Sequence, residues 1–142
     1  MVVHVCVFGK DGRLLIQQRA EKKRIWPGCW DVSVGGGVDA GETSRQGAER
    51  EVREELGYAL DLTGRRASVT VQFPGGFDDF FLVVRDLDIS ALTLQKEEVR
   101  QVRWATLEEV LTLVDAGSFI RYPKSFLRYL FETRDTFGFP TK

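Results

Sequence analysis

The sequence predicts an α/β fold, in which helices cover both faces of one mixed β-sheet in an α/β/α sandwich. Short β-branched apolar runs alternate with glycine-containing turns, a long helical pattern interrupts them, and two further helical patterns follow near the end. A length of 142 residues with 43% apolar residues suits a single domain with its own core, which we place at residues 1–142.

The first third of the chain predicts a β-hairpin followed by a loop and a short strand. Apolar runs at residues 2–8 and 14–19 flank Gly9-Lys10-Asp11-Gly12, a turn sequence that tolerates positive φ. Residues 20–30 form a loop that contains Trp26 and Trp30. Residues 31–34 form a short strand, which leads directly into Gly35-Gly36-Gly37.

The remainder alternates between helix and strand. A helix is expected from Thr43 to Leu56, with Gly57 as its stop. Strands at residues 69–73 and 80–84 flank Pro74-Gly75-Gly76 and form a second hairpin, and another strand covers residues 99–104. Thr106 is expected to cap a helix over residues 107–114 in a capping box with Glu109, and a last amphipathic helix covers residues 124–133.

Composition excludes several classes of protein. The 20 Lys and Arg residues nearly balance the 21 Asp and Glu residues, which argues against binding a nucleic-acid polymer through bulk electrostatics. Two cysteines, Cys6 and Cys29, make no disulfide framework, so a reducing, cytoplasmic compartment is expected. The first apolar run is too short for a signal peptide or a membrane span. These observations favour an enzyme or a binder of a small ligand.

The central helix concentrates negative charge on one face. Glu51, Glu54 and Glu55 fall within an arc of about 100° on a helical wheel, next to an apolar face. Such carboxylates repel one another by roughly 0.2–0.5 kcal/mol per pair on an exposed helix. A hard divalent cation would convert that repulsion into binding, and Mg²⁺ with retained water suits oxygen ligands of this kind. The alternative is a solvated acidic helix face.

The residues around this helix form a longer pattern. Residues 36–58 fit G-x5-E-x7-R-E-U-x-E-E-x-G-U at every position except the last, where Tyr58 replaces a smaller aliphatic residue. The pattern resembles the Nudix box, the signature of the Nudix hydrolases. The fixed positions of the match are Gly36, Glu42, Arg50, Glu51, Val52, Glu54, Glu55 and Gly57. The resemblance implies the Nudix fold with its loop-helix-loop motif.

The resemblance also implies a function. Nudix hydrolases are pyrophosphatases, which cleave a nucleoside diphosphate linked to another moiety and use Mg²⁺ or Mn²⁺ to activate water. By this resemblance Glu51 and Glu55 are metal ligands, Glu54 is a third or outer ligand, and the backbone carbonyl of Gly35 is a further one. The partner is then a small nucleoside diphosphate derivative, which undergoes hydrolysis of an acid anhydride.

Three further residues receive catalytic roles from the resemblance. Arg50 would orient Glu51 or Glu42 through charge-assisted hydrogen bonds, and Glu42 would tie the loop to the start of the helix. The general base does not always come from the box in this family. Glu98 lies where relatives often hold a catalytic glutamate on a loop, and the alternative is a solvated carboxylate in a turn.

A second resemblance leads to an alternative function. Residues 14–42 also resemble type 1 isopentenyl-diphosphate isomerase, a Nudix-fold enzyme, but its cysteine and metal-binding histidine fall on Gly35 and Gly37. The isomerase activity is therefore disfavoured. Arg19 and Lys23 match positions where the isomerase grips a diphosphate, and the alternative is that both are surface charges. A binding domain without catalysis is a third reading, which the complete set of box glutamates argues against.

The substrate is not identified by the sequence. Candidates for stacking on a base are found among Trp26, Trp30, Phe73, Phe77, Phe80 and Tyr122, but aromatics in alternating strands are more often core residues, so Phe73 and Phe81 are expected in the core. Among the aromatic candidates, Phe77 is the one most expected to meet a ligand. Phe77, Asp78 and Asp79 are expected to meet the ligand from a glycine-flanked loop. A homodimer is possible in this family. The sequence starts inside its expected first strand, whereas isomerase-like relatives often have an N-terminal extension. We expect either that this member of the family is short or that its sequence has been trimmed.

Overall fold

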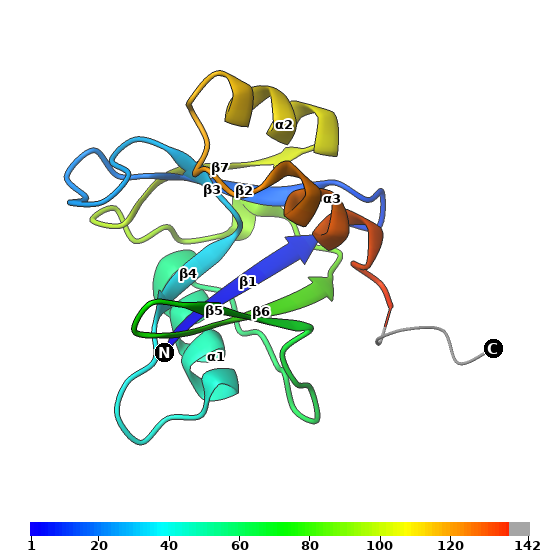
Figure 1. Ribbon diagram of the computed structural model, residues 1–142. Helices are drawn as coiled ribbons and strands as arrows, with labels where there is room; N and C mark the ends of the chain where they lie inside the picture. The colour runs from blue at the N-terminus through cyan, green and yellow to red at the C-terminus, as the bar shows by residue number, and fades with distance from the viewer. Residues whose placement is uncertain (137–142) are drawn as a thin grey trace.

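The computed structural model describes residues 1–136. Their strands join into one sheet, drawn in Figure 1. The strands are β1 (Val2–Phe8), β2 (Leu14–Arg19), β3 (Trp30–Asp31), β4 (Val34–Gly37), β5 (Val69–Phe73), β6 (Gly76–Val84) and β7 (Val99–Ala105). The helices are α1 (Ser44–Leu56), α2 (Leu107–Asp115) and α3 (Lys124–Glu132), with a 3₁₀ turn at Ile89–Ala91.

The sheet is mixed, as predicted. Its strand order is β3-β2-β1-β6-β5, with β4 paired to β1 and β7 paired to β2. β1 and β6 are parallel, and the other strand pairs are antiparallel. One edge of β1 is shared, because Val2–Val5 pair with β4 while Phe8 pairs with Leu14 of β2. This fork brings the three glycines of β4 beside the first half of β1.

Helices cover both faces of the sheet (Figure 1), which confirms the predicted sandwich. α1 packs on one face through Ala48, Val52 and Leu56, all fully buried. α2 and α3 pack on the opposite face through Val110, Leu127 and Leu130. Each fully buried leucine or valine contributes about 1.5–3 kcal/mol relative to an exposed one, so two separate apolar cores hold the three layers together.

The ends of α1 follow the sequence signals. The Thr43 side chain accepts a hydrogen bond from the Gln46 N–H, and the Gln46 side chain accepts one from the Thr43 N–H. Gly57 ends the helix in the left-handed conformation, with φ of 65°. α2 begins with the predicted capping box between Thr106 and Glu109. These caps fix where α1 starts and therefore which of its side chains face β4.

Two predicted strand boundaries were wrong. Residues 31–34 are not one strand, because Ser33 interrupts the strand and lies where β1 and β2 separate. Its hydroxyl donates to the Leu15 carbonyl at 2.5 Å and accepts from the Val7 N–H at 2.8 Å, in place of ladder hydrogen bonds. β6 starts at Gly76, so Phe77 and Asp79 lie in a strand and not in a loop. Parallel pairing with β1 extends that strand, since Val2 already faces Asp78.

The expected core position of Phe73 was also wrong. Phe73 is 37% exposed because β5 lies at the edge of the sheet, where neither helix layer covers it, whereas Phe81 is buried as predicted.

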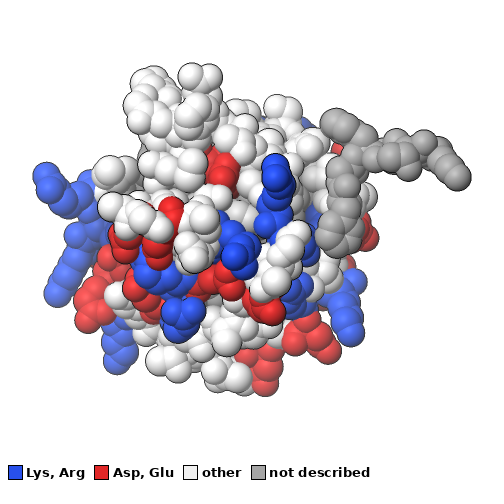
Figure 2. All heavy atoms as spheres, turned by 90° about the horizontal axis from the view of Figure 1, so that it is seen from below, with Lys and Arg blue, Asp and Glu red and all other residues white. Residues whose placement is uncertain are grey.

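Within residues 1–136, no helix is both long and apolar enough to cross a lipid bilayer. The face seen from below in Figure 2 carries acidic and basic side chains interspersed.

Candidate functional site

The carboxylates of α1 meet the glycines of β4. Glu55 is 5% exposed, and its Oε1 accepts hydrogen bonds from the Gly35 N–H at 3.3 Å and from the Gln17 side chain at 3.4 Å. Glu51 lies against Gly36, where an added Cβ would be only 2.3 Å from the Glu51 carboxyl carbon. Glycine at position 36 therefore makes room for the Glu51 carboxylate.

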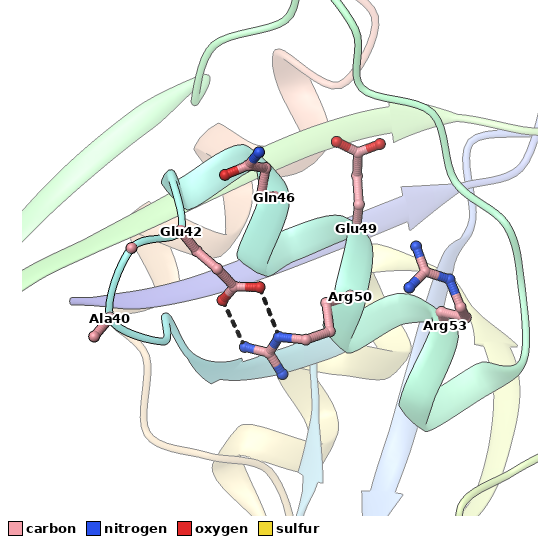
Figure 3. Close-up of a pocket in the computed structure, with 7 residues that line it drawn as sticks. Ala40, Glu42, Gln46, Glu49, Arg50 and Arg53 are labelled. Carbon is pink, nitrogen blue, oxygen red and sulfur yellow. Dashed lines mark hydrogen bonds and ion pairs between the residues drawn. The ribbon is translucent and has the colours of Figure 1, made fainter.

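Arg50 connects this carboxylate face to the loop that precedes α1 (Figure 3). Its guanidinium binds both oxygens of Glu42, at 2.9 and 3.0 Å, and donates to Glu51 at 2.9 Å. It also donates to Glu54 at 3.2 Å and to the Gly37 carbonyl at 2.8 Å. The Asp39 N–H donates to Glu42 at 2.9 Å, so Glu42 holds the turn before the helix. The contacts of Arg50 with Glu42 and Glu51 are those that the resemblance implied, those with Glu54 and Gly37 were not expected, and the catalytic roles of these residues stay predictions.

The pKa values of Glu51 and Glu55 are raised, even though Arg50 pairs with Glu51. Burial is the main cause that raises the pKa of Glu55 to about 8, and the neighbouring Glu51 charge adds to it. Burial also raises the pKa of Glu51, although the Arg50 hydrogen bond opposes this, and Glu54 and Glu98 add to the increase. A cation placed between Glu51 and Glu55 would relieve both effects.

These residues fit a hard divalent cation by their donor chemistry. Within residues 1–136 no group of three His, Cys, Asp or Glu side chains is already close enough to chelate a metal, since Arg50 holds Glu51 and Glu54. Mg²⁺, however, is commonly bound by only one or two carboxylates and keeps several waters. Glu51 and Glu55, with the Gly35 peptide beside them, supply that donor set, and Gly36 leaves the space for it.

Gly36→Ala is expected to raise the Mg²⁺ concentration needed for half-maximal activity by roughly tenfold, because the new methyl group displaces Glu51. A Mg²⁺ titration of activity measures this. Gly37→Ala is the matched control, since a Cβ there meets no atom within 4 Å. Equal Mg²⁺ requirements in the two variants would contradict a metal-holding role for Glu51.

Glu98 joins the same group of carboxylates from the loop before β7. Its charge contributes to the raised pKa of both Glu51 and Glu55. The loop is tied to α1 by the Gln95 N–H, which donates to the Glu55 carbonyl at 3.0 Å. The Glu98 carboxylate forms an ion pair with Lys23, and the Ala20 N–H donates to the Glu98 carbonyl at 3.0 Å. The structure thus brings Lys23, Glu98 and the α1 carboxylates together.

Arg19 lies at the base of the loop over residues 20–29. Its Nε and Nη2 donate to the Ile25 carbonyl at 3.1 and 2.9 Å, and Nη1 lies 4.0 Å from Asp31 Oδ2. The guanidinium is 19% exposed and therefore organises the loop. Its proposed contact with a diphosphate stays a prediction.

Phe77 and Asp79 lie in β6, and Asp79 is near the first turn of α1. Phe77 is 48% exposed at the start of β6. Asp79 is 8% exposed, accepts a hydrogen bond from the Thr70 hydroxyl at 2.5 Å, and lines a pocket with Ser44 and Arg45 at the first turn of α1. Glu51 and Glu55 are in the last turns of that helix, so Asp79 is not brought together with them.

The sequence did not indicate a buried polar cluster behind β4. His4 Nδ1 lies 2.8 Å from Asp78, the Tyr122 hydroxyl donates to Asp31 at 2.7 Å, and that hydroxyl lies 3.4 Å from His4 Nε2. His4 is paired with Gly35 across the sheet, and a Cβ on Gly35 would be 2.6 Å from the imidazole. Burial lowers the pKa of His4, but Asp78 and Asp31 outweigh it and raise the pKa.

The raised pKa of Glu55 predicts how the stability of the metal-free protein depends on pH. The folded protein holds the Glu55 proton up to about pH 8, whereas the ordinary value for the unfolded chain is 4.5. The folded state then binds more protons between these values, so the free energy of unfolding falls as pH rises through this window. Urea unfolding in EDTA at pH 5 to 8 measures it. If the difference in the free energy of unfolding between wild type and Glu55→Gln did not change with pH, Glu55 would not be protonated in the folded protein as described.

Comparison with known proteins agrees with the sequence motif. The family model for the NUDIX domain matches residues 1–125. An uncharacterized Nudix hydrolase of Listeria innocua is 49% identical over 135 residues, covering 95% of this chain and 79% of the relative. An isopentenyl-diphosphate Delta-isomerase of Brevibacterium linens is 31% identical over 126 residues, covering 78% of this chain and 64% of the isomerase.

A solved structure has the same fold. The crystal structure of DR0079 from Deinococcus radiodurans superimposes with a TM-score of 0.73 at 26% identity, over 90% of this chain and 80% of that one. Together with the family match over most of the chain, these similarities confirm the α/β Nudix fold. The chain belongs to the Nudix hydrolase family.

Proposed function

We propose that this protein is a Mg²⁺- or Mn²⁺-dependent hydrolase that cleaves the diphosphate bond of a nucleoside diphosphate linked to another moiety. The observation that carries the proposal is the pair of carboxylates facing the glycines of β4, the buried Glu55 and the half-buried Glu51. Their raised pKa values indicate a site that gains stability when a cation binds.

Each residue of the site then has a role. A bound Mg²⁺ or Mn²⁺ supplies Lewis acidity and a more acidic water molecule. Glu51 and Glu55 hold the cation, and Arg50 keeps Glu51 in place through its bridge to Glu42. The absence of side chains at Gly35–Gly37 leaves space for phosphate oxygens beside the carboxylates.

Glu98 is the proposed general base. Its carboxylate is paired with Lys23 and is close enough to Glu51 and Glu55 to raise their pKa. When a diphosphate enters, its oxygens can take over the Lys23 ammonium, which frees Glu98 to accept a proton from water. The pair therefore supports both proposed roles, phosphate binding by Lys23 and proton transfer by Glu98.

The isomerase alternative has less support even though isomerases are among the relatives. The positions of the isomerase cysteine and histidine are Gly35 and Gly37, and neither has a side chain that could donate a proton or bind a metal. A purely binding domain would not need the complete set of box glutamates, Glu42, Glu51, Glu54 and Glu55.

The proposal is tested by measuring phosphate and nucleotide release from a panel of nucleoside diphosphate derivatives with Mg²⁺ or Mn²⁺, and again with EDTA. Cleavage of at least one compound that stops in EDTA is the expected result. Tight, metal-dependent binding without cleavage of any compound would favour the binding domain, and isomerisation of isopentenyl diphosphate would favour the isomerase.

Arg19→Ala is expected to raise KM by roughly tenfold with little change in kcat, because a guanidinium contact with phosphate contributes to substrate binding. Steady-state kinetics on the best compound of the panel measure this. Arg24→Ala, an exposed arginine of the same loop, serves as the control. Unchanged kinetics in Arg19→Ala would remove Arg19 from the site.

A further inference from the structure

The loop between β2 and β3 holds Trp26 in an unusual conformation. With φ of 52°, Trp26 is the only residue other than glycine in residues 1–136 with a positive φ. Such backbone is unfavourable for a side chain as bulky as tryptophan and persists only where its surroundings impose it. The indole nevertheless does not gain burial from this conformation, since Trp26 remains 38% exposed.

Hydrogen bonds on both sides of Trp26 impose the conformation. Arg19 makes its two hydrogen bonds to the Ile25 carbonyl, and the Cys29 N–H donates to the Trp26 carbonyl at 3.3 Å. The Gln18 side chain donates to the Gly28 carbonyl at 3.0 Å. The loop is therefore built to present the indole at the surface in one orientation.

Arg121 covers one part of that indole. Its guanidinium carbon lies 5.8 Å from the ring centroid, within range of a cation–π contact. The segment carrying Arg121 is fixed on β3, because the Trp30 N–H donates to the Ser118 carbonyl at 2.8 Å and the Ile120 N–H donates to the Trp30 carbonyl at 2.9 Å. Two planar groups, one aromatic and one cationic, are thus held together on the surface.

The Trp26–Arg121 pair is connected to the metal-holding end of the sheet. Tyr122 follows Arg121 directly, and its hydroxyl contacts Asp31 and lies 3.4 Å from His4. His4 packs on Gly35, whose N–H donates to Glu55. Lys23, in the same loop as Trp26, pairs with Glu98, which lies close enough to Glu51 and Glu55 to affect them, so this loop also reaches the carboxylate site.

We infer that Trp26 and Arg121 form a stacking platform for the nucleobase of the substrate and so determine its specificity. This inference rests on the proposed function. A purine or pyrimidine ring gains from stacking on an indole and a guanidinium, whereas a sugar or an aliphatic group gains little. Neither Trp26 nor Arg121 needs to touch the reacting phosphates.

The test compares two ligands that cannot be hydrolysed, α,β-methylene-ADP and methylenediphosphonate, which differ by the nucleoside. Calorimetry with Mg²⁺ measures their affinity for the wild type and for Trp26→Leu, Trp26→Phe and Phe73→Ala. Trp26→Leu is expected to weaken the binding of α,β-methylene-ADP by roughly tenfold and the binding of methylenediphosphonate by less than about twofold. Trp26→Phe keeps most of the affinity because it restores an aromatic face. Phe73→Ala is the control, because Phe73 in β5 is 37% exposed and so matches Trp26 in exposure. This substitution is expected to leave the affinity for both ligands unchanged.

Three results would overturn the platform: equal weakening of both ligands, no difference between Trp26→Leu and Trp26→Phe, or no binding of α,β-methylene-ADP by the wild type. The hydrolase proposal fails separately. If no compound of the panel is cleaved but the selective effect of Trp26→Leu is found, the platform stands in a nucleotide-binding domain.

Discussion

Replacing Glu55 with glutamine is expected to lower kcat by roughly 10³-fold while leaving the fold intact. Glutamine has nearly the same shape but no charge, so it cannot hold a divalent cation, whose contribution to catalysis amounts to several kcal/mol. Glu55 is 5% exposed and burial raises its pKa to about 8, so the folded acid must take up a proton at neutral pH, which a neutral amide of the same shape does not need. The variant is therefore expected to melt at the wild-type temperature or above it.

The measurement is turnover at saturating Mg²⁺ together with thermal unfolding of the metal-free proteins. Glu49→Gln is the matched control, because Glu49 is on the same helix but pairs with Arg45 on its other flank. Wild-type turnover in Glu55→Gln would contradict the proposed site. A variant that loses activity only because it unfolds would do the same, since the account predicts undiminished stability.

Arg50→Ala is expected to lower activity by roughly 100-fold and to lower the melting temperature by several degrees. The substitution leaves Glu42, Glu51 and Glu54 without the guanidinium that separates and orients them. Groups that orient metal ligands typically change activity or metal affinity by 10- to 100-fold when removed. Arg50→Lys is expected to recover little, because one ammonium cannot replace the bidentate contact with Glu42.

Kinetics and thermal unfolding of Arg50→Ala, Arg50→Lys and Arg53→Ala distinguish this role from general charge effects. Arg53 is on the same helix and is shown in Figure 3 apart from the Glu42–Arg50 contact. Full activity in Arg50→Lys would show that only a positive charge is needed. An equal loss in Arg53→Ala would contradict the specific role of Arg50.

The sequence predicted best the parts of the fold that depend on local signals. The predicted helix from Thr43 to Leu56 with Gly57 as its stop agrees with α1, although Thr43 is the N-cap and not the first helical residue. The same segment contains Glu42, Arg50 and Glu51, which the structure brings into contact. The resemblance to the Nudix box implied these neighbours, whereas helix spacing alone does not, because Glu42 precedes the helix.

Features that depend on distant pairing were not predicted. Asp78 and Asp79 belong to β6 because Val2 and Val3 of β1 pair with them, which no turn signal near Pro74 indicates. The cluster around His4 joins residues 74 and 118 positions away in the chain, Asp78 and Tyr122. The only sequence signal was a single histidine in an otherwise apolar strand, and it does not identify its partners. The Lys23–Glu98 pair was missed for the same reason, although each residue was a candidate separately.

The central claim is that Glu51 and Glu55 hold a divalent cation, and Mn²⁺ binding tests it most directly. Electron paramagnetic resonance of free Mn²⁺ at pH 8 gives the dissociation constant for the wild type, Glu51→Gln, Glu55→Gln and the Glu49→Gln control. The account predicts at least roughly tenfold weaker binding in the first two variants and wild-type binding in the control. Equal affinity in all four proteins would contradict it.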